Sequence, residues 1–361
     1  MSVIDTTENC RHCLMCRHMC PVGHVSHLET LTPHGWGQIV ASEKRGLLEW
    51  NDSTVDVMYS CADCGVCQSH CVTDQPLPDA IAAVRANLVQ EGLAPSMVET
   101  LKKRLAKWGN PYEEKVPEPP EGNGEYALFV GDASVHLWDK TVPALLKVLK
   151  KIGIEPALIG KGCNSGYLPS SLGLHDMAKG FSQQILTELK ETGATKLLVM
   201  SPGDYYTIHT LYPERLGVSL PEDVELIDVM SLLDEKHTSG ELSFNRIEMG
   251  LPYAYVDPTH AVRTLDRLEA PRRLLNAVLP TPVIELFWRK ERAHPAGDGV
   301  LQFVQPELSL LLTQARNEDA TQAGAQGMIT EDSATLYQLN QLSPSGLPVK
   351  GMYELLADRV A

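Results

Sequence analysis

Eight of the nine cysteines in this chain of 361 residues lie within its first 71 residues. They form two runs with the same internal spacing, C-x2-C-x2-C-x3-C. Three thiolates at this spacing wrap one face of a [4Fe–4S] cube, and in proteins with two cubes the fourth cysteine of each run binds the other cube. Thiolate is also the ligand that soft iron–sulfide clusters prefer. The first run is Cys10, Cys13, Cys16 and Cys20, and the second is Cys61, Cys64, Cys67 and Cys71.

The spacing therefore predicts two [4Fe–4S] clusters. Three other uses of the cysteines fit less well. Structural disulfides are typical of small secreted proteins, zinc sites usually take two CxxC pairs and would leave the third cysteine of each triplet unexplained, and unrelated buried thiols would not repeat one spacing. We expect cluster 1 on Cys10, Cys13, Cys16 and Cys71, and cluster 2 on Cys61, Cys64, Cys67 and Cys20.

The composition narrows the class of protein. Apolar residues make up 43% of the chain and charged residues 21%, which is typical of globular proteins. The net charge of −15 argues against nucleic-acid binding, which requires a basic surface. No apolar run approaches the roughly 18 residues of a membrane span, and the N-terminus lacks the pattern of a secretory signal. We expect a cytoplasmic protein, peripheral at a membrane at most through its partners.

Helical patterns surround the cysteine runs. Forty residues separate Cys20 from Cys61, and residues 36–44 among them have the pattern of a helix. Apolar residues at three- and four-residue steps predict further helices over 77–92 and 95–108. The N-terminal segment therefore resembles a helical two-cluster ferredoxin, like the C-terminal part of the iron–sulfur subunit of succinate dehydrogenase.

The rest of the chain alternates between strand and helix patterns. A proline-rich acidic stretch at 116–125 predicts a linker. Beyond it, strands are expected at 126–130, 155–159, 196–200, 253–256, 283–287 and 327–330, and helices at 142–152, 177–192 and 272–279. Strands separated by helices indicate parallel sheets. We predict an α plus α/β chain with a ferredoxin domain at 1–115 and a duplicated α/β region, its repeats at 126–245 and 246–361.

Several segments resemble the cysteine-rich, or CCG-domain, iron–sulfur oxidoreductases. This family includes the catalytic subunit of heterodisulfide reductase, the iron–sulfur subunit of glycolate oxidase and one subunit of anaerobic glycerol-3-phosphate dehydrogenase. The resemblance is carried by Gly109-Asn-Pro-Tyr112, by Gly160-Lys-Gly-Cys-Asn-Ser-Gly166 and by Val256-Asp-Pro-Thr-His-Ala-Val-Arg263. It implies a two-cluster ferredoxin followed by two copies of the CCG domain.

The family's CCG cysteines are nearly all replaced in this chain. The resemblance aligns them in the first copy with Asp132, Cys163-Asn164, Ser201 and Asp204, and in the second with Thr259, Pro295-Ala296 and residues 332–335. One thiol cannot hold a cluster that needs about four soft ligands, so we interpret this region as a degenerate scaffold. Cys163 itself is either a reactive thiol or, as we favour, a small buried side chain. His260 and Arg263 are expected to brace a loop.

The sequence favours an iron–sulfur electron-transfer subunit of a multi-subunit oxidoreductase, with no catalytic residues of its own. It would relay single electrons between a flavoprotein partner, either an FAD-linked dehydrogenase or an electron-transfer flavoprotein, and a quinone or other carrier. Two alternatives stay open: a thiol/disulfide oxidoreductase like heterodisulfide reductase, and a scaffold with structural clusters.

Overall fold

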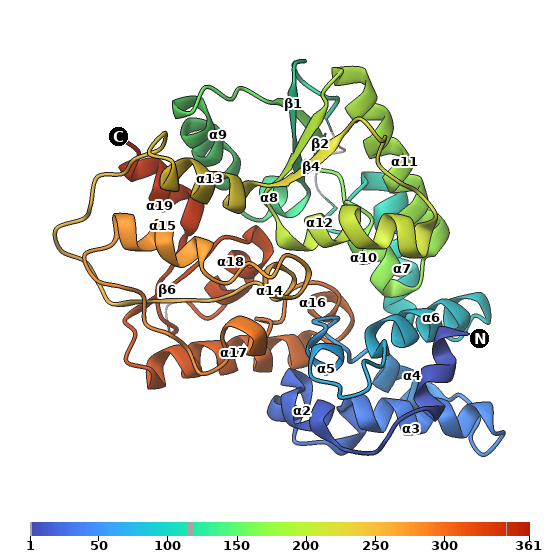
Figure 1. Cartoon of the computed structure of the whole chain (residues 1–361). Helices are drawn as coiled ribbons and strands as arrows, with labels where there is room; N and C mark the ends of the chain where they lie inside the picture. Colours follow the sequence, from blue (N-terminus) through green and yellow to red (C-terminus); the bar gives the residue numbers. More distant parts are fainter. Residues whose placement is uncertain (1, 114–117, 344) are drawn as a thin grey trace.

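The chain consists of a helical N-terminal part and two α/β parts, each built on a small parallel sheet (Figure 1). The computed structural model describes residues 2–113, 118–343 and 345–361. No helix in these ranges is both long and apolar enough to cross a membrane.

Short helices joined by tight turns carry the two cysteine runs. Local capping explains several boundaries: Pro33 starts one helix because its missing N–H is not needed there, and the Thr32 side chain accepts a hydrogen bond from the backbone N–H of Gly35. Asn51 and Thr54 form a capping box at the next long helix. The elements of this part are η1 (Val3–Glu8), α1 (Met15–Met19), α2 (Pro21–Ser26), η2 (Glu29–Leu31), α3 (Pro33–Lys44), α4 (Asp52–Met58), α5 (Val66–Ser69), α6 (Leu77–Gln90) and α7 (Ser96–Trp108).

The first sheet has four parallel strands in the order β2-β1-β3-β4. Its central strands are buried, as expected for a sheet with helices on both faces. Its strands are β1 (Tyr126–Gly131), β2 (Ala157–Lys161), β3 (Lys196–Val199) and β4 (Glu225–Asp228). Its helices are α8 (Ala133–His136), α9 (Thr141–Lys151), α10 (Tyr167–Leu172), α11 (His175–Thr192), α12 (Pro202–Tyr206), the π-helix η3 (Thr207–Leu216) and α13 (Val229–Thr238).

The second sheet repeats this strand order. It has three parallel strands in the order β5-β6-β7, and Ile284 adds a parallel bridge to Ala254 on the free side of β5. In both sheets the second segment along the chain therefore pairs on one side of the first, and the third on its other side. The strands are β5 (Tyr253–Tyr255), β6 (Gly327–Thr330) and β7 (Val349–Gly351), and the helices are α14 (Thr259–Thr264), α15 (Ala270–Val278), η4 (Lys290–Arg292), α16 (Leu301–Val304), α17 (Pro306–Gln322), α18 (Ser333–Asn340) and α19 (Met352–Arg359).

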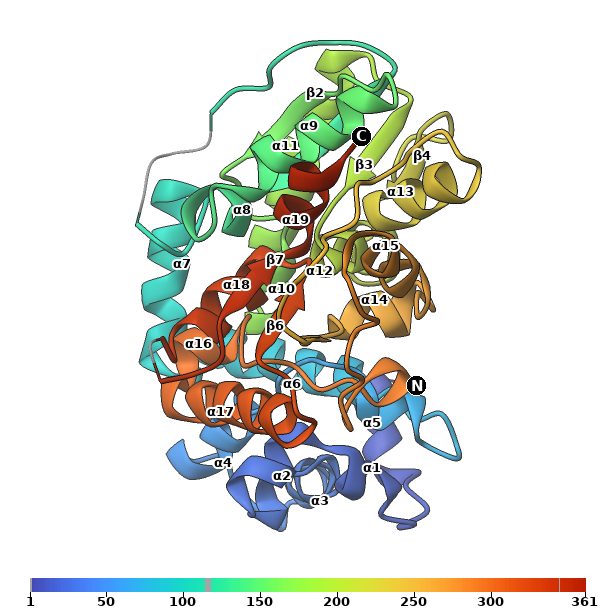
Figure 2. The same cartoon turned by 90° about the vertical axis from the view of Figure 1, so that its left-hand side faces the viewer.

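One apolar core joins the two sheets. It contains Leu128 and Val130 of the first sheet together with Tyr253 and Ile329 of the second. Tyr353 is fully buried in it, and its hydroxyl donates a hydrogen bond to the carbonyl of Met200. The two α/β parts therefore form one continuous body, with α9 and α19 in contact between them (Figure 2).

The helical part is held to this body by Arg85, which is 1% exposed. Its guanidinium donates hydrogen bonds to the carbonyls of Met58 and Cys61 within the helical part, at 2.9 and 3.1 Å, and to the carbonyl of Ser171 in the first α/β part, at 2.9 Å. Tyr59 lies beneath the guanidinium and donates to the carbonyl of Leu172. On the other side, α17 contacts α2 (Figures 1 and 2).

The predicted α plus α/β class with parallel sheets is confirmed. The strand predicted at 155–159 begins two residues later, and the segment predicted at 283–287 contributes a single bridge rather than a full strand. Part of the predicted linker, at 116–117, lies outside the described residues. The rest of it is not free, because Glu118 and Glu121 form antiparallel bridges to Lys161 and Leu158 of β2.

The contact between Gly173 and α6 gives a first prediction. Gly173 has a φ of +88°, and a Cβ there would lie 2.6 Å from the backbone carbonyl of Arg85. We expect Gly173→Ala to lower the free energy of unfolding by about 3 kcal/mol, since a backbone clash adds to the cost of a left-handed alanine. Gly193→Ala is the matched control, with a similar φ of +69° and open space around it. Its expected loss is only about 1 kcal/mol. Denaturant unfolding of both variants checks this, and equal losses would contradict it.

Candidate functional site

The two cysteine runs fold in the same way. In each run the residues two and four positions after the first cysteine have positive φ angles: His12 and Leu14 in the first run, Asp63 and Gly65 in the second. Left-handed backbone is costly for residues other than glycine, so its recurrence marks a conformation that the surrounding structure imposes. The shared spacing therefore gives a shared backbone path around each group of thiols.

This path points backbone N–H groups at sulfur. The N–H of His12 donates to the Sγ of Cys10, and that of Asp63 donates to the Sγ of Cys61, both at 3.4 Å. Such hydrogen bonds stabilise thiolates and tune the potential of a cluster. The Nδ1 atom of the His12 imidazole, in contrast, lies 3.4 Å from the Nε2 atom of the His34 imidazole.

The cysteines gather in two sets that each mix the two runs. The thiol of Cys16 is affected electrostatically by Cys10, Cys13 and Cys71. We call these four the outer set, because Cys13 is exposed and the other three are partly exposed. The thiol of Cys67 is affected by Cys20, Cys61 and Cys64, and more weakly by Cys16. We call Cys20, Cys61, Cys64 and Cys67 the inner set, because all four are buried.

The inner set lines a small cavity of about 10 Å³ together with apolar residues. Trp36 is among the lining residues, and its buried indole N–H has no hydrogen-bond partner within the described part of the chain. Buried donors without an acceptor are rare and costly. A cluster bound here would supply sulfur acceptors, so the four thiols and the indole N–H fit a [4Fe–4S] group.

The state of the thiols supports the same fit. Burial raises the pKa of Cys16 to about 11 and that of Cys61 to about 12, and it also raises the pKa of Cys20, Cys64 and Cys67. Without metal these thiols would stay protonated at neutral pH. Iron binding would supply the positive charge that makes them thiolates. In the described ranges no three His, Cys, Asp or Glu side chains are placed to hold a single ion; ligands of a cube instead bind separate iron atoms.

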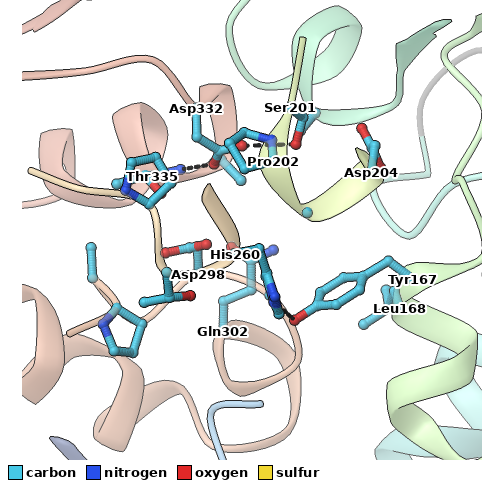
Figure 3. Close-up of a pocket in the computed structure, with 18 of the residues that line it drawn as sticks. Tyr167, Leu168, Ser201, Pro202, Asp204, His260, Asp298, Gln302, Asp332 and Thr335 are labelled. Atoms are coloured by element: carbon cyan, nitrogen blue, oxygen red, sulfur yellow. Dashed lines mark hydrogen bonds between the residues drawn. The ribbon is translucent and has the colours of Figure 1, made fainter. Parts of the chain in front are cut away.

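A second cavity of about 110 Å³, partly open to solvent, lies between the loops that follow the strands of the two sheets (Figure 3). We call it the central cavity. The residues that follow β1 and β3 line it from one side, and those that follow β5 and β6 line it from the other. Ligands of open parallel sheets bind at these carboxyl ends of strands. The lining includes most positions at which the resemblance predicted cysteine replacements: Asp132, Asn164, Ser201, Asp204, Thr259, Pro295, Ala296, Asp332, Ala334 and Thr335.

Equivalent positions of the two halves touch across the central cavity. Ser201 lies two residues beyond β3 and Asp332 two residues beyond β6, and the Ser201 hydroxyl donates to the Asp332 carboxylate at 2.9 Å. The other oxygen of Asp332 accepts from the N–H of Thr335, also at 2.9 Å. Both contacts are drawn in Figure 3. The pairing links the loop that follows β3 to the loop that follows β6.

Cys163, His260 and Arg263 have separate roles. Cys163 is fully buried and does not line the central cavity, in keeping with the small buried side chain that we favoured. Arg263 braces segments other than the loop that follows the strand predicted at 253–256, donating to the carbonyls of Cys64 and Ala293. His260 lines the cavity, is 3.1 Å from the Tyr167 hydroxyl and stacks on Tyr206. Burial lowers the pKa of His260 to about 4, so its imidazole is neutral at physiological pH.

Two aspartates of the central cavity have raised pKa values. Burial raises the pKa of Asp204 to about 7, and the nearby carboxylates of Asp132 and Asp332 add to this effect. Burial and the charge of Asp332 likewise raise the pKa of Asp298 to about 7. Sequence reasoning missed Asp298, together with the cavity residues Tyr112, Tyr167 and Gln302. These lie in loops or at helix ends, where no spacing signals a site.

Comparison with known proteins agrees with this picture. Residues 6–74 match the family described as "4Fe-4S dicluster domain". The chain is 25% identical over 286 residues to a subunit of the dihydromethanophenazine:CoB–CoM heterodisulfide reductase of Methanosarcina acetivorans, covering 75% of this chain and 69% of that protein. The same protein of Methanosarcina barkeri gives equal values. A crystal structure of a hypothetical protein from Helicobacter pylori superposes with a TM-score of 0.60 over 90% of this chain and 67% of the other, at 15% identity.

The predicted resemblance is thus confirmed. The chain is homologous to this heterodisulfide reductase subunit, at low identity. Its N-terminal part is a dicluster domain for two [4Fe–4S] clusters, and the chain is an iron–sulfur subunit of an oxidoreductase.

The raised pKa of Asp204 predicts a pH-dependent stability. Its pKa is about 7 in the folded chain and close to 3.8 in the unfolded chain, so the folded state binds more protons between these values. Stability therefore falls as the pH rises from about 4 to 7, and the cost is fully present above pH 7. We expect Asp204→Asn to raise the thermal midpoint, relative to the wild type, more at pH 8 than at pH 5. Glu191→Gln, an exposed change on α11, is the control. An equal effect of Asp204→Asn at both pH values would refute the assignment.

Proposed function

We propose that the chain relays single electrons between two [4Fe–4S] clusters within an oxidoreductase complex. The outer set, Cys10, Cys13, Cys16 and Cys71, would bind cluster 1, and the inner set, Cys20, Cys61, Cys64 and Cys67, would bind cluster 2. The observation that carries the proposal is the contrast in burial between the two sets. An exposed cluster can exchange electrons with another protein, and a buried one can pass them inward.

The residues of the chain supply the surroundings of each cluster. Backbone N–H groups donate to cysteine sulfur in both runs. Arg85 and Arg263 bind the carbonyls of Cys61 and Cys64, so two cationic groups lie close to the buried set. These cations would offset the negative charge of a buried thiolate-ligated cluster. When bound, the clusters supply reversible one-electron chemistry.

The partner that fits is a flavoprotein dehydrogenase or an electron-transfer flavoprotein. A flavin accepts a pair of electrons, and two clusters can carry them away singly to a quinone or other carrier. We propose a ferredoxin domain at 1–115, a connector at 116–125 and two CCG-like repeats at 126–245 and 246–361. The alternative of a thiol/disulfide oxidoreductase is disfavoured, because Cys163 is the one cysteine beyond the ferredoxin domain and is buried away from the central cavity.

Iron content and chelator resistance test the cluster assignment. Anaerobically purified protein should contain about eight iron atoms, and Cys20→Ala and Cys71→Ala about four each, because each removes one ligand of one cube. The two variants should differ in which cluster they keep. Cys20→Ala keeps the outer cluster, which a chelator should strip rapidly, whereas Cys71→Ala keeps the buried one, which should resist. Cys163→Ala, the control, should keep eight. The opposite pattern of resistance would overturn the assignment of the fourth ligands.

The docking face of the partner gives a further prediction. Val72 follows Cys71 and is 70% exposed, so a flavoprotein that reaches cluster 1 would cover it. We expect Val72→Glu to weaken capture of the flavoprotein from the native host at least tenfold, roughly the cost of burying an unpaired charge. Leu47→Glu, at a site 77% exposed on another loop, should leave capture unchanged. Iron analysis verifies that both variants retain their clusters. Recovery of no flavoprotein by the wild-type chain would contradict the partner proposal.

A further inference from the structure

The central cavity lies directly against the inner cysteine set. Ala62 lines both the central cavity and the cavity of the inner set, so the two cavities are neighbours that share this residue. His294 also lines the central cavity, and its Nε2 is 3.0 Å from the carbonyl of Met19, the residue before Cys20. A molecule in the central cavity would therefore be a close neighbour of cluster 2.

The charges around the central cavity exclude anionic ligands. Five aspartates line it, and no lysine or arginine is among its lining residues in the described part of the chain. Asp257 is neutralised by the guanidinium of Arg272, at 2.8 Å. The other four are Asp132, Asp204, Asp298 and Asp332. A carboxylate, phosphate or thiolate ligand would meet these carboxyl groups without a cation to balance it.

The same carboxyl groups can supply protons. With pKa values of about 7, Asp204 and Asp298 each exist partly in the protonated form at neutral pH. A group with a pKa near the working pH is the most effective proton donor. The groups close enough to interact electrostatically or by hydrogen bonds with Asp204 are Asp132, Asp332, Ser165, Ser201, Tyr112, Tyr212 and Cys163, and those with Asp298 are Asp332, Thr335 and Tyr167.

Aromatic and imidazole side chains line the central cavity, and such side chains pack well against a planar ring. Tyr112, Tyr167, His260 and Phe303 are among its lining residues. Figure 3 shows His260 between Tyr167 and Asp298, with its imidazole next to the Tyr167 hydroxyl. Aromatic walls with a few convergent polar groups are typical of sites for small organic molecules.

We propose that the central cavity binds the ring of a neutral aromatic dione, the head group of a quinone, beside cluster 2. The inference rests on the proposed relay and names its terminal carrier. Cluster 2, when bound by Cys20, Cys61, Cys64 and Cys67, would supply the two electrons one at a time, and one proton would come from each of Asp204 and Asp298. Both carbonyl π bonds of the dione are lost and two O–H bonds form, giving the aromatic diol, while solvent protons restore the two carboxyl groups.

Binding of menadione, a dione without a long tail, tests the site on the protein with both clusters bound. Isothermal titration should give one site per chain. Ala334→Trp, which places a large side chain in the lining, should weaken binding at least about tenfold through overpacking. Ala323→Trp, at the exposed end of α17, is the control and should bind as the wild type does. Equal binding by all three proteins would overturn the proposal.

The pH profile provides a readout that a structural effect would not move. If menadione hydrogen-bonds to protonated Asp298, its affinity should fall by up to about tenfold per pH unit above pH 7. Asp298→Asn keeps a donor at all pH values, so its affinity should be nearly constant from pH 6 to 8. This isosteric change also keeps the test valid should Ala334→Trp fail to fold. A profile unchanged by Asp298→Asn would refute the role of this carboxyl group.

Two further outcomes separate this inference from the relay. Binding of tetramethylammonium instead of menadione would assign the cavity to organic cations and overturn the dione. Reduction of both clusters by the flavoprotein, followed by electron paramagnetic resonance, tests the relay independently. Normal cluster reduction without menadione binding would refute the carrier site alone, whereas absence of reduction would refute the relay itself.

Discussion

A buried guanidinium fixes the helical part against the first α/β part, within an apolar cluster that also joins them. Arg85 is almost wholly removed from water, and a charge in that position is tolerated only when its donors are satisfied. Its partners are carbonyls of α4, of the second cysteine run and of α10. Any shift of the helical part against the first sheet would leave a charged donor unpaired. The backbone around Cys61 is thereby fixed relative to the central cavity.

The halves of the α/β region share more than a strand order. Positions two residues beyond the third strand of each sheet meet in the Ser201–Asp332 hydrogen bond, so the repeat places equivalent loops face to face. Where the related family has cysteines, this chain has mainly oxygen-bearing or small side chains. The loops that carry these positions surround a cavity, with carboxyl groups around it. A domain whose role is only to pack against its neighbours would not need such a cavity.

The cysteine spacing and the main buried strands could be predicted from the sequence, because each has a local pattern. The strands β4 and β7 could not: they are short edge strands that end in Asp228 and Gly351, without an apolar run. The central cavity was also beyond local patterns. Its sides come from loops up to about 270 residues apart, from Ala62 to Ala334, and only the folded sheets bring these together. Most positions that the resemblance aligned with cysteines line the central cavity, but they did not predict that Asp298 or Tyr167 would line it.

Two clusters with identical ligand spacing can still differ in the free energy of adding an electron. Around the outer set, water can reorient when charge is added, and this screening lowers the cost of an extra electron. Around the inner set the response must come from fixed groups, namely the guanidiniums of Arg85 and Arg263 and the indole of Trp36. Fixed dipoles need no rearrangement when charge arrives. With clusters bound as proposed, the duplicated motif would give one cube whose reduction energy depends on solvent and one whose reduction energy depends on fixed groups of the protein interior.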